Sequence, residues 1–172
     1  GEHLVAAAFR SIAEAPDIDD IKGTLIVALS ESVSRAASGQ HLQLTNQTCS
    51  DVEAFYVNVA VNKTGALLAL PLQFASLFNQ QVATGALAAR RCGEQLGLAY
   101  QILDDLKPYA MPSKLADDED MQNRVITAPV AACSMLFPHV DPFQTLIKKT
   151  DMRDKATLEC LRWLDTAVAN AR

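Results

Sequence analysis

The sequence contains few aromatic residues, no basic stripe and no long apolar run. Aromatics make up 6% of the 172 residues, whereas 49% are hydrophobic, with Ala and Leu dominant. Ala and Leu have high helix propensities, so this composition favours packed helices over strands. The length suits one domain with a sizeable core and is too short for two ordinary domains. The net charge of −5 and the scattered Lys and Arg residues argue against a nucleic-acid partner.

Targeting signals and metal-binding patterns are also missing. Cys49, Cys92, Cys133 and Cys160 show no CxxC or Cys/His spacing, which argues against a zinc site or a disulfide framework. The start of the chain, GEHLVAAAFRSIAEAP, lacks the charged segment and cleavage site of a signal peptide. No apolar run reaches the ~18 residues that a membrane span needs. The sequence therefore predicts reduced thiols, a cytoplasmic location and no membrane span.

Hydrophobic periodicity and helix breakers predict about seven helices with short connections. We expect helices near 4–15, 21–37, 50–79, 81–107, 127–137 and 142–149, followed by a C-terminal amphipathic helix. The second should stop at Gly39, the third should begin with a Ser50–Glu53 capping box, and Pro71 should kink the third. Residues 108–122 are predicted to form a flexible surface loop. The residues expected to point inward are Leu4, Ala8, Phe9, Ile12, Leu25, Leu29, Leu158, Leu161, Leu164 and Val168.

The helix near 81–107 ends in an unusual group of polar residues. Positions 96–106 are apolar almost all round, and Gln101, Asp104 and Asp105 share one sector of the helix. Two adjacent carboxylates are costly to bury unless a positive charge meets them. The sector faces either a polar cavity or solvent, and this helix alone does not decide between the two.

A lysine in the preceding helix favours the cavity. Lys63 lies in the middle of an apolar stripe, and Thr64 and Gly65 follow it directly. The stripe consists of Val52, Tyr56, Val59, Ala66, Leu67 and Leu70. Carboxylate pairs on a helix bind Mg²⁺ together with phosphate oxygens, and a lysine opposite them neutralises charge on a departing diphosphate. With an apolar remainder that could hold a hydrocarbon tail, this constellation indicates prenyl transfer.

Several motifs resemble those of the trans-isoprenyl diphosphate synthases, or polyprenyl synthetases. GQHLQL at 39–44 is similar to the family's GQxxDL, and NKTGALL at 62–68 is similar to its KT segment. LGLAYQILDDL at 96–106 resembles the stretch that leads into the second aspartate-rich motif. SKLADDED, TAP at 127–129 and the initial GEHLVAAAF also match in order and approximate spacing. The resemblance covers essentially the whole chain.

The resemblance implies an all-α helical bundle of the isoprenoid-synthase type, as a single domain over 1–172 that lacks the family's N-terminal helices. Members of the family join isopentenyl diphosphate to an allylic diphosphate. The resemblance also implies Mg²⁺ as cofactor, and a homodimer or a heteromer with a related chain. The implied metal ligands are Asp104 and Asp105, the implied catalytic residues are Lys63, Thr64 and Asp104, and the implied substrate-binding residues are Gln40, Lys63, Thr64, Gln101 and Lys114.

The chain departs from the family pattern at the positions that carry chemistry. No first aspartate-rich motif is present, and Pro108 stands where the second motif should have its third carboxylate. Gln43 replaces the aspartate of GQxxDL, and Val125 replaces a loop lysine. Lys107 could partly compensate for the lost ligand, since a cation is favourable near a helix C-terminus. The acidic ADDED run at 116–120 is interpreted as a solvated loop, with a lid over a metal site as the alternative.

Two hypotheses about function therefore remain. The first is a prenyltransferase that condenses isopentenyl diphosphate with an allylic diphosphate. The second is a non-catalytic subunit or isoprenoid-binding module that acts through a partner chain. The missing ligands favour the second hypothesis, whereas Lys63, Thr64, Gln101 and the aspartate pair favour the first.

Overall fold

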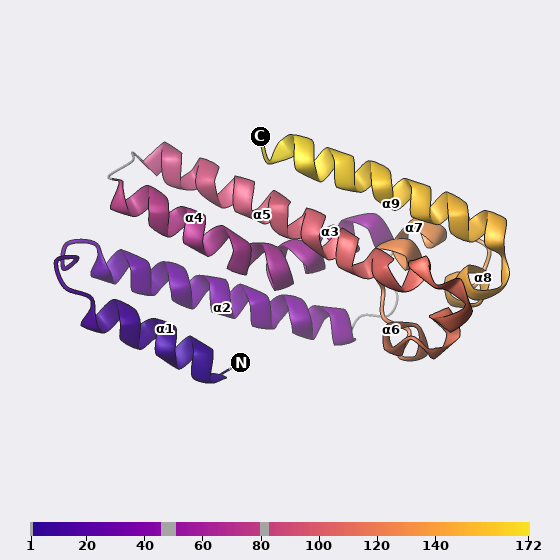
Figure 1. Cartoon of the computed structure of the whole chain (residues 1–172), viewed down its shortest axis with the longest axis horizontal. Coiled ribbons are helices and arrows are strands. Elements are labelled where there is room, and N and C mark those ends of the chain that lie inside the picture. The colour runs from indigo at the N-terminus through magenta and orange to yellow at the C-terminus, as the bar shows by residue number, and fades with distance from the viewer. Residues whose placement is uncertain (1, 46–50, 80–82) are drawn as a thin grey trace.

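The computed structural model describes residues 2–45, 51–79 and 83–172, and every element within them is helical (Figure 1). This confirms the all-α prediction. The elements in chain order are α1 (Glu2–Glu14), α2 (Lys22–Thr45), α3 (Val52–Ala60), the π-helical turn η1 (Val61–Gly65), α4 (Ala66–Phe78), α5 (Ala83–Leu106), the 3₁₀ turns η2 (Lys107–Ala110) and η3 (Pro112–Asp117), α6 (Glu119–Gln122), α7 (Ala128–Leu136), α8 (Pro142–Lys148) and α9 (Thr150–Asn170).

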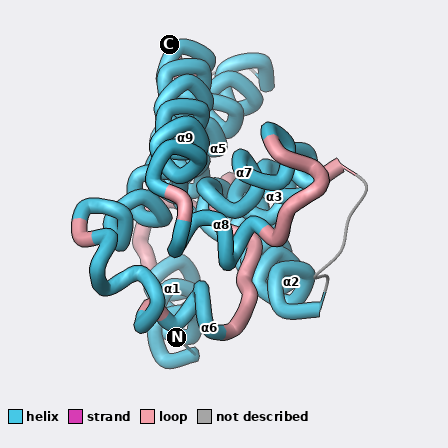
Figure 2. The backbone as a smooth tube through the Cα atoms, turned by 90° about the vertical axis from the view of Figure 1, so that its right-hand side faces the viewer, coloured by secondary structure: helices cyan, strands magenta, loops and turns pink. Residues whose placement is uncertain are grey.

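The long helices lie side by side, and the short ones gather at one end of the bundle. Helix α5 packs between α4 and α9, while α2 packs against α4 and η1 and carries α1 on its other side (Figure 1). Figure 2 looks at the end where α6, α7 and α8 cluster near the end of α5. The C-terminal end of α5, with its two aspartates, therefore lies beside the short helices rather than in open solvent.

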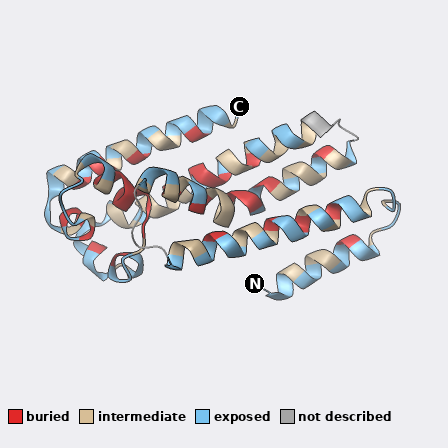
Figure 3. Cartoon of the chain, turned by 180° about the vertical axis from the view of Figure 1, so that it is seen from behind, coloured by how far each residue is buried: buried red, intermediate tan, exposed pale blue. Residues whose placement is uncertain are grey.

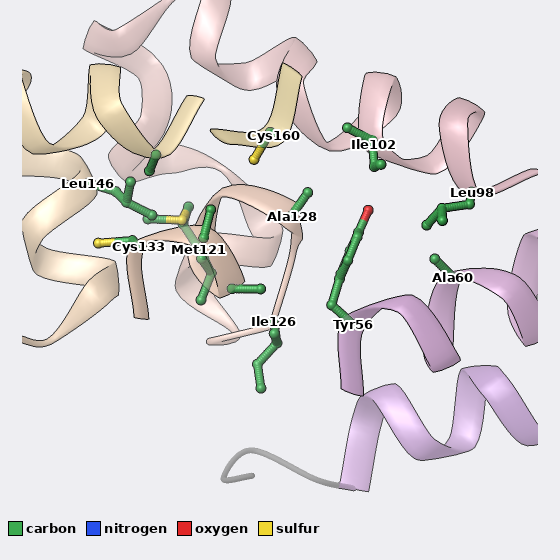
Figure 4. Close-up of a cluster of buried hydrophobic side chains, with 14 of the residues drawn as sticks. Tyr56, Ala60, Leu98, Ile102, Met121, Ile126, Ala128, Cys133, Leu146 and Cys160 are labelled. Carbon is green, nitrogen blue, oxygen red and sulfur yellow. The ribbon is translucent and has the colours of Figure 1, made fainter. Parts of the chain in front are cut away.

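Two hydrophobic clusters hold this arrangement together. The larger cluster surrounds Tyr56 and Ile102 and joins α3, α5, α7, α8 and α9 (Figure 4). The smaller cluster joins α1, α2 and α4 around Ile12, Leu25 and Leu29. Burial of Leu25 and Leu29 was predicted from the sequence and is confirmed.

Glycines let α2, η1, α4 and α5 approach one another closely. A Cβ at Gly39 would lie only 2.6 Å from the backbone nitrogen of Lys63, and a Cβ at Gly97 would clash with the Cα of Gly65. The prediction that α2 stops at Gly39 is therefore wrong, because α2 continues to Thr45 and uses this glycine for packing rather than for a C-cap.

The third predicted helix differs from expectation at its start and in its middle. Asp51 is the N-cap residue, and its side chain accepts a hydrogen bond of 3.0 Å from the backbone N–H of Ala54. The predicted cap, Ser50, lies outside the described residues. The irregular segment is η1, and Pro71 lies within α4. A π turn winds more slowly than an α-helix, so side chains beyond it rotate away from the 3.6-residue pattern. Of the stripe residues beyond η1, Leu67 is 46% exposed, whereas Ala66 is buried and Leu70 packs against the smaller cluster.

The prediction of a flexible surface loop over 108–122 is wrong. The segment forms η2, η3 and α6, and Leu115 and Met121 within it are buried. A proline stands in the first turn of both 3₁₀ elements, where its fixed φ favours the turn. The segment is ordered because two of its apolar side chains insert into the larger cluster.

The predicted inner face of α9 is mostly wrong. Leu158, Leu161 and Val168 are exposed, and Figure 3 shows the outer side of this helix largely in the exposed colour. The buried positions are Arg153, Ala156, Cys160 and Ala167. Small side chains allow α9 to pack closely on α5 and α7, so residue size outweighs hydrophobicity in choosing the inner face.

Buried Arg153 and exposed Leu4 are two further departures from simple amphipathic patterning. The Arg153 guanidinium donates hydrogen bonds to the carbonyl oxygens of Leu146 at 3.1 Å and Ile147 at 3.3 Å, near the C-terminus of α8. These bonds satisfy carbonyls that have no partner within α8. Leu4, which was expected to point inward, is 78% exposed, whereas Ile12 of the same helix is buried as predicted.

We predict that Gly97→Ala destabilises the protein and that Gly23→Ala does not. The new Cβ at Gly97 would clash with backbone atoms of Gly65, whereas nothing lies within 4 Å of a Cβ at Gly23. Overpacking should lower the free energy of unfolding by about 1–3 kcal/mol, and alanine in an open helical position should raise it by about 0.5–1 kcal/mol. Urea denaturation of both variants measures this. Equal effects of the two substitutions would contradict the close approach of η1 and α5.

Candidate functional site

A small polar cavity lies where α5 ends. Its volume is about 110 Å³, and its walls come from α2, η1, α5, η2, α6 with the residue before it, and the segment before α7. It is large enough for several water molecules or a small hydrated ion. The lining residues are Gln43, Lys63, Gln101, Asp104, Asp105, Pro108, Tyr109, Asp118, Asp120, Met121 and Thr127.

Lys63 enters the cavity from the π turn. Its side chain is half-buried, and its ammonium group donates a hydrogen bond of 2.9 Å to the Gln43 side-chain oxygen. Gln43 is a neutral amide, so it orients the ammonium without cancelling its charge. Among the ion pairs of the described residues, none involves Lys63. The ammonium charge is therefore free to act on a ligand.

Thr64 begins a chain of hydrogen bonds that connects three elements. Its hydroxyl donates to the Gln101 side-chain oxygen at 2.7 Å, and the Gln101 amide donates to one Asp105 oxygen at 2.8 Å. The other Asp105 oxygen accepts a bond of 2.8 Å from the backbone N–H of Ala128, the first residue of α7. Asp105 thus fixes the start of α7 against the end of α5, and each of its oxygens keeps a lone pair for another ligand.

Asp105 carries its negative charge in an environment that opposes it. Burial raises the pKa of Asp105, although the hydrogen bonds from Ala128 and Gln101 work in the other direction. The nearby Tyr56 hydroxyl is buried and, within the described residues, makes no hydrogen bond of good geometry. Burial first, and then the Asp105 charge, raise the pKa of Tyr56, so the phenol stays neutral. A cation in the cavity would offset the cost of the Asp105 charge.

Asp104 is more exposed and is paired. Its oxygen accepts a hydrogen bond of 2.6 Å from the Lys107 ammonium, and the side chains are 45% and 70% exposed. The hydrogen bond and the charge of Asp104 raise the pKa of Lys107. An exposed pair of this kind contributes little stability, so a stronger cation can replace the lysine at Asp104. Lys107, which was expected to compensate partly for the lost ligand, thus pairs with Asp104, and its compensating role stays a prediction.

The acidic run at 116–120 contributes two side chains to the cavity. Asp118 and Asp120 line it, whereas Asp117 and Glu119 do not. Burial and the neighbouring Asp118 carboxylate raise the pKa of Asp120, while the charge of Lys63 acts in the opposite direction. The interpretation of the run as a solvated loop is therefore correct for only part of it.

The structure brings together most of the predicted site residues but not all. Lys63, Gln101, Asp104 and Asp105 line one cavity, and Thr64 reaches it through Gln101. Gln40 and Lys114 are exposed and do not line the cavity, so the structure gives no support to their predicted substrate-binding roles.

Three lining residues were missed by the sequence analysis, and one of them is Met121 of α6. Tyr109 lies in η2 and Thr127 directly precedes α7, where irregular backbone hides both from any periodicity. For Thr127, the only signal was its place in the TAP motif.

The donor atoms of the cavity suit Mg²⁺, but they do not form a complete cage. Carboxylate oxygens are the ligands that this ion prefers, and it commonly uses one or two of them together with water and phosphate oxygens. Pro108 lines the cavity and supplies no ligand. Within the described residues, no group of three His, Cys, Asp or Glu side chains is arranged to hold a metal ion. The site therefore fits a magnesium ion that brings phosphate oxygens with it.

Behind Lys63, a polar cluster joins η1 to two helices. The Arg35 guanidinium donates to the Asn62 side-chain oxygen at 2.9 Å and to Glu94 at 2.6 Å. The same Glu94 oxygen accepts a bond of 3.0 Å from Arg90. Although burial opposes ionisation, the bonds from Arg90 and Arg35 hold the pKa of Glu94 below its usual value. None of the four residues of this cluster lines the cavity.

Comparison with known proteins identifies the family of this chain. The family model for polyprenyl synthetases matches residues 1–162, so the chain belongs to the polyprenyl synthetase family. Solanesyl diphosphate synthase 3, chloroplastic/mitochondrial, of Arabidopsis thaliana is 25% identical over 166 residues, which are 94% of this chain and 38% of the plant protein. The resemblance proposed from the motifs is confirmed.

Solved structures share the fold. A polyprenyl synthase from Roseobacter denitrificans matches with a TM-score of 0.75 and 22% identity over 99% of this chain and 60% of the other. A decaprenyl diphosphate synthase from Rhodobacter capsulatus matches with a TM-score of 0.64 and 24% identity over 86% of this chain and 52% of the other. The isoprenoid-synthase type of fold is confirmed, and this chain spans less than two thirds of each relative.

Within the described residues, no helix is both long and apolar enough to cross a membrane. The relative from Arabidopsis thaliana is named as chloroplastic/mitochondrial, so the cytoplasmic location of this chain stays a prediction.

We predict that Glu94 makes the free energy of unfolding depend on pH. Because the folded-state pKa of Glu94 lies below its unfolded value of 4.5, the ionised form stabilises the fold above that pH, and this contribution is lost as pH falls through the folded pKa. Wild-type protein should be more stable than Glu94→Gln at neutral pH, and the difference should shrink between about pH 5 and pH 3. Urea denaturation across this range measures it, and a difference independent of pH would contradict the ionised cluster.

Proposed function

We propose that this chain acts in isoprenoid biosynthesis by binding the diphosphate group of an allylic isoprenoid diphosphate in the cavity at the end of α5. One observation carries this proposal: Lys63 and the pair Asp104 and Asp105 line the same cavity from different elements. A cation-binding wall opposite an ammonium group is the arrangement that a diphosphate and its metal ions require. Membership of the polyprenyl synthetase family supports the same assignment.

Each side chain of the cavity has a role in this proposal. The Lys63 ammonium would donate to phosphate oxygens, and the Thr64 hydroxyl orients Gln101 through its donated hydrogen bond of 2.7 Å; binding of a phosphate oxygen by Thr64 itself would require this hydroxyl to turn away from Gln101. Asp104 and Asp105 would hold Mg²⁺, which neutralises negative charge on the diphosphate when bound. Because Lys63 has no carboxylate partner among the described residues, its full charge stabilises the negative charge that develops on the leaving diphosphate.

In a prenyltransferase, the allylic carbon–oxygen bond breaks, the double bond of isopentenyl diphosphate forms the new carbon–carbon bond, and the released pyrophosphate takes up the proton that is lost. Lys63, Thr64 and Asp104 would act at the departing diphosphate. The chain offers the second aspartate pair for this reaction but no first aspartate-rich motif. Isopentenyl diphosphate is therefore the less well supported of the two substrates.

A second candidate function is that of a non-catalytic subunit or isoprenoid-binding module. Pro108 at the third-carboxylate position and the Lys107–Asp104 pair of 2.6 Å favour it, because both reduce the number of free metal ligands. Either function fits a homodimer or a heteromer with a related chain. The outward residues Leu96, Tyr100 and Leu103 of α5 are 44–56% exposed, which leaves an apolar stripe for a partner to cover.

We predict that Lys63→Met weakens the binding of magnesium pyrophosphate at least about tenfold, because it removes a hydrogen bond from a charged donor. Lys155→Met is the matched control, since this exposed lysine lies on α9 and does not line the cavity. Isothermal titration with pyrophosphate, with and without Mg²⁺, measures both variants. Equal loss in both variants, or unchanged binding in Lys63→Met, would remove Lys63 from the site.

We predict that binding and turnover separate the two candidate functions. Wild-type protein and Lys63→Met are incubated with labelled isopentenyl diphosphate, allylic primers of several lengths and Mg²⁺. Incorporation that requires Mg²⁺ and falls in Lys63→Met supports a prenyltransferase. Pyrophosphate binding without incorporation from any primer supports the non-catalytic module, and absence of both would reject the proposed diphosphate site.

A further inference from the structure

The side chain next to Lys63 is held by three hydrogen bonds. The amide nitrogen of Asn62 donates to the Asn58 carbonyl oxygen at 2.9 Å and to the Asn58 side-chain oxygen at 2.8 Å. Its amide oxygen accepts the bond of 2.9 Å from the Arg35 guanidinium. The first two bonds stay within the same helical segment, so it is the bond from Arg35 that connects Asn62 to another helix.

Arg35 reaches two elements at once. It lies on α2, and its separate nitrogens bond to Asn62 of η1 and to Glu94 of α5. The Arg35 and Glu94 side chains are 25% and 18% exposed, so the pair is partly shielded from water. Partial burial makes these charge-assisted bonds stronger than an exposed pair. Arg35 therefore connects the π turn with both neighbouring helices without lining the cavity itself.

A π turn needs such external support. It is rare and short because its own hydrogen-bond pattern is less favourable than that of an α-helix. If η1 relaxed to an α-helix, the residues that follow it would shift in register relative to those that precede it. Each residue of this shift would rotate their side chains by about 100° around the helix axis. Lys63 and Thr64 would then leave Gln43 and Gln101, their partners at 2.9 Å and 2.7 Å.

We propose that Arg35 is a positioning residue for the diphosphate site: it holds η1 as a π turn through Asn62 and Glu94, so that Lys63 lines the cavity and Thr64 stays bonded to Gln101. This inference rests on the proposed function. It assigns a role to a residue that neither lines the cavity nor belongs to any of the matched motifs.

The shape of the guanidinium explains why arginine stands at this position. Its nitrogens form a planar fork that can serve two acceptors in fixed directions, whereas the lysine ammonium is a single point charge on a flexible stem. Arg35→Lys keeps the charge and can bond to Asn62 or to Glu94, but not to both in the observed geometry. The substitution therefore tests the fork separately from the charge.

The chain contains a matched control for Arg35. Arg90 donates to the same Glu94 oxygen, at 3.0 Å, but it makes no bond to Asn62 within the part of the chain that the structure describes. Arg90→Lys should weaken the Glu94 cluster and lower the melting temperature, as Arg35→Lys does, without releasing η1. A purely structural role for Arg35 would make the two variants behave alike.

The experiment combines binding with hydrogen exchange. Wild type, Arg35→Lys, Arg90→Lys, Asn62→Ala and the double variant Arg35→Lys with Asn62→Ala are titrated with magnesium pyrophosphate, and amide exchange is followed over residues 61–65. We expect Arg35→Lys to raise Kd at least about tenfold and to remove exchange protection over this segment. Arg90→Lys should keep wild-type Kd and protection. Asn62→Ala should raise Kd by a smaller factor in the Arg35→Lys background than in wild type, because the two substitutions share the Arg35–Asn62 contact.

Two results would overturn the inference: equal changes in Kd for Arg35→Lys and Arg90→Lys, or unchanged exchange protection over 61–65 in Arg35→Lys. If wild-type protein does not bind magnesium pyrophosphate, the proposed function fails. The exchange data then decide whether Arg35 holds the π turn, so the two failures are distinguishable.

Discussion

The π turn η1 is the constraint on which the site depends. It stands between α3, whose Tyr56 fills the larger core, and α4, whose Ala69 packs against Gly93 of α5. In a continuous α-helix, the directions of all side chains along this segment would be fixed by one 3.6-residue repeat. The side chains that fill the core, line the cavity and contact α5 could not then all point in the required directions. The wider π turn changes the directions of the side chains that follow it relative to those that precede it. Lys63 can therefore face a polar cavity while apolar residues on both sides of it remain packed.

Electrostatics then couple the ligands of the cavity to one another. Four aspartates and one lysine line it, so the cavity attracts a cation more readily than a free anion. A diphosphate alone would meet repulsion from Asp104, Asp118 and Asp120, whereas a divalent cation held by Asp104 and Asp105 would reduce this repulsion. Each ligand thus raises the affinity for the other, and this coupling is reciprocal. The burial that raises the pKa of Asp105 strengthens the same preference for a cation.

Sequence alone was enough to find four of the cavity residues, because charged side chains in apolar helices are costly unless an opposite charge meets them. The family motifs supported these residues independently. Prediction from sequence failed where packing, rather than periodicity, sets the structure. Gly39 looks like a helix stop but permits contact with Lys63, and a π turn leaves no mark in a 3.6-residue pattern. The partners of Arg35 lie 27 and 59 positions away, beyond the range of any local rule.

Pro108 stands where the family motif has its third carboxylate, and it affects the path of the chain as well as the set of ligands. Proline cannot continue α5, so the chain turns into η2 and η3 at this point, and the buried Leu115 and Met121 return it to the bundle. That path brings Asp118 and Asp120 to the cavity that Pro108 itself lines. The cavity therefore loses a carboxylate from the helix yet keeps a negative surplus. A cation remains electrostatically favoured there, although Pro108 supplies no oxygen atom that could hold it.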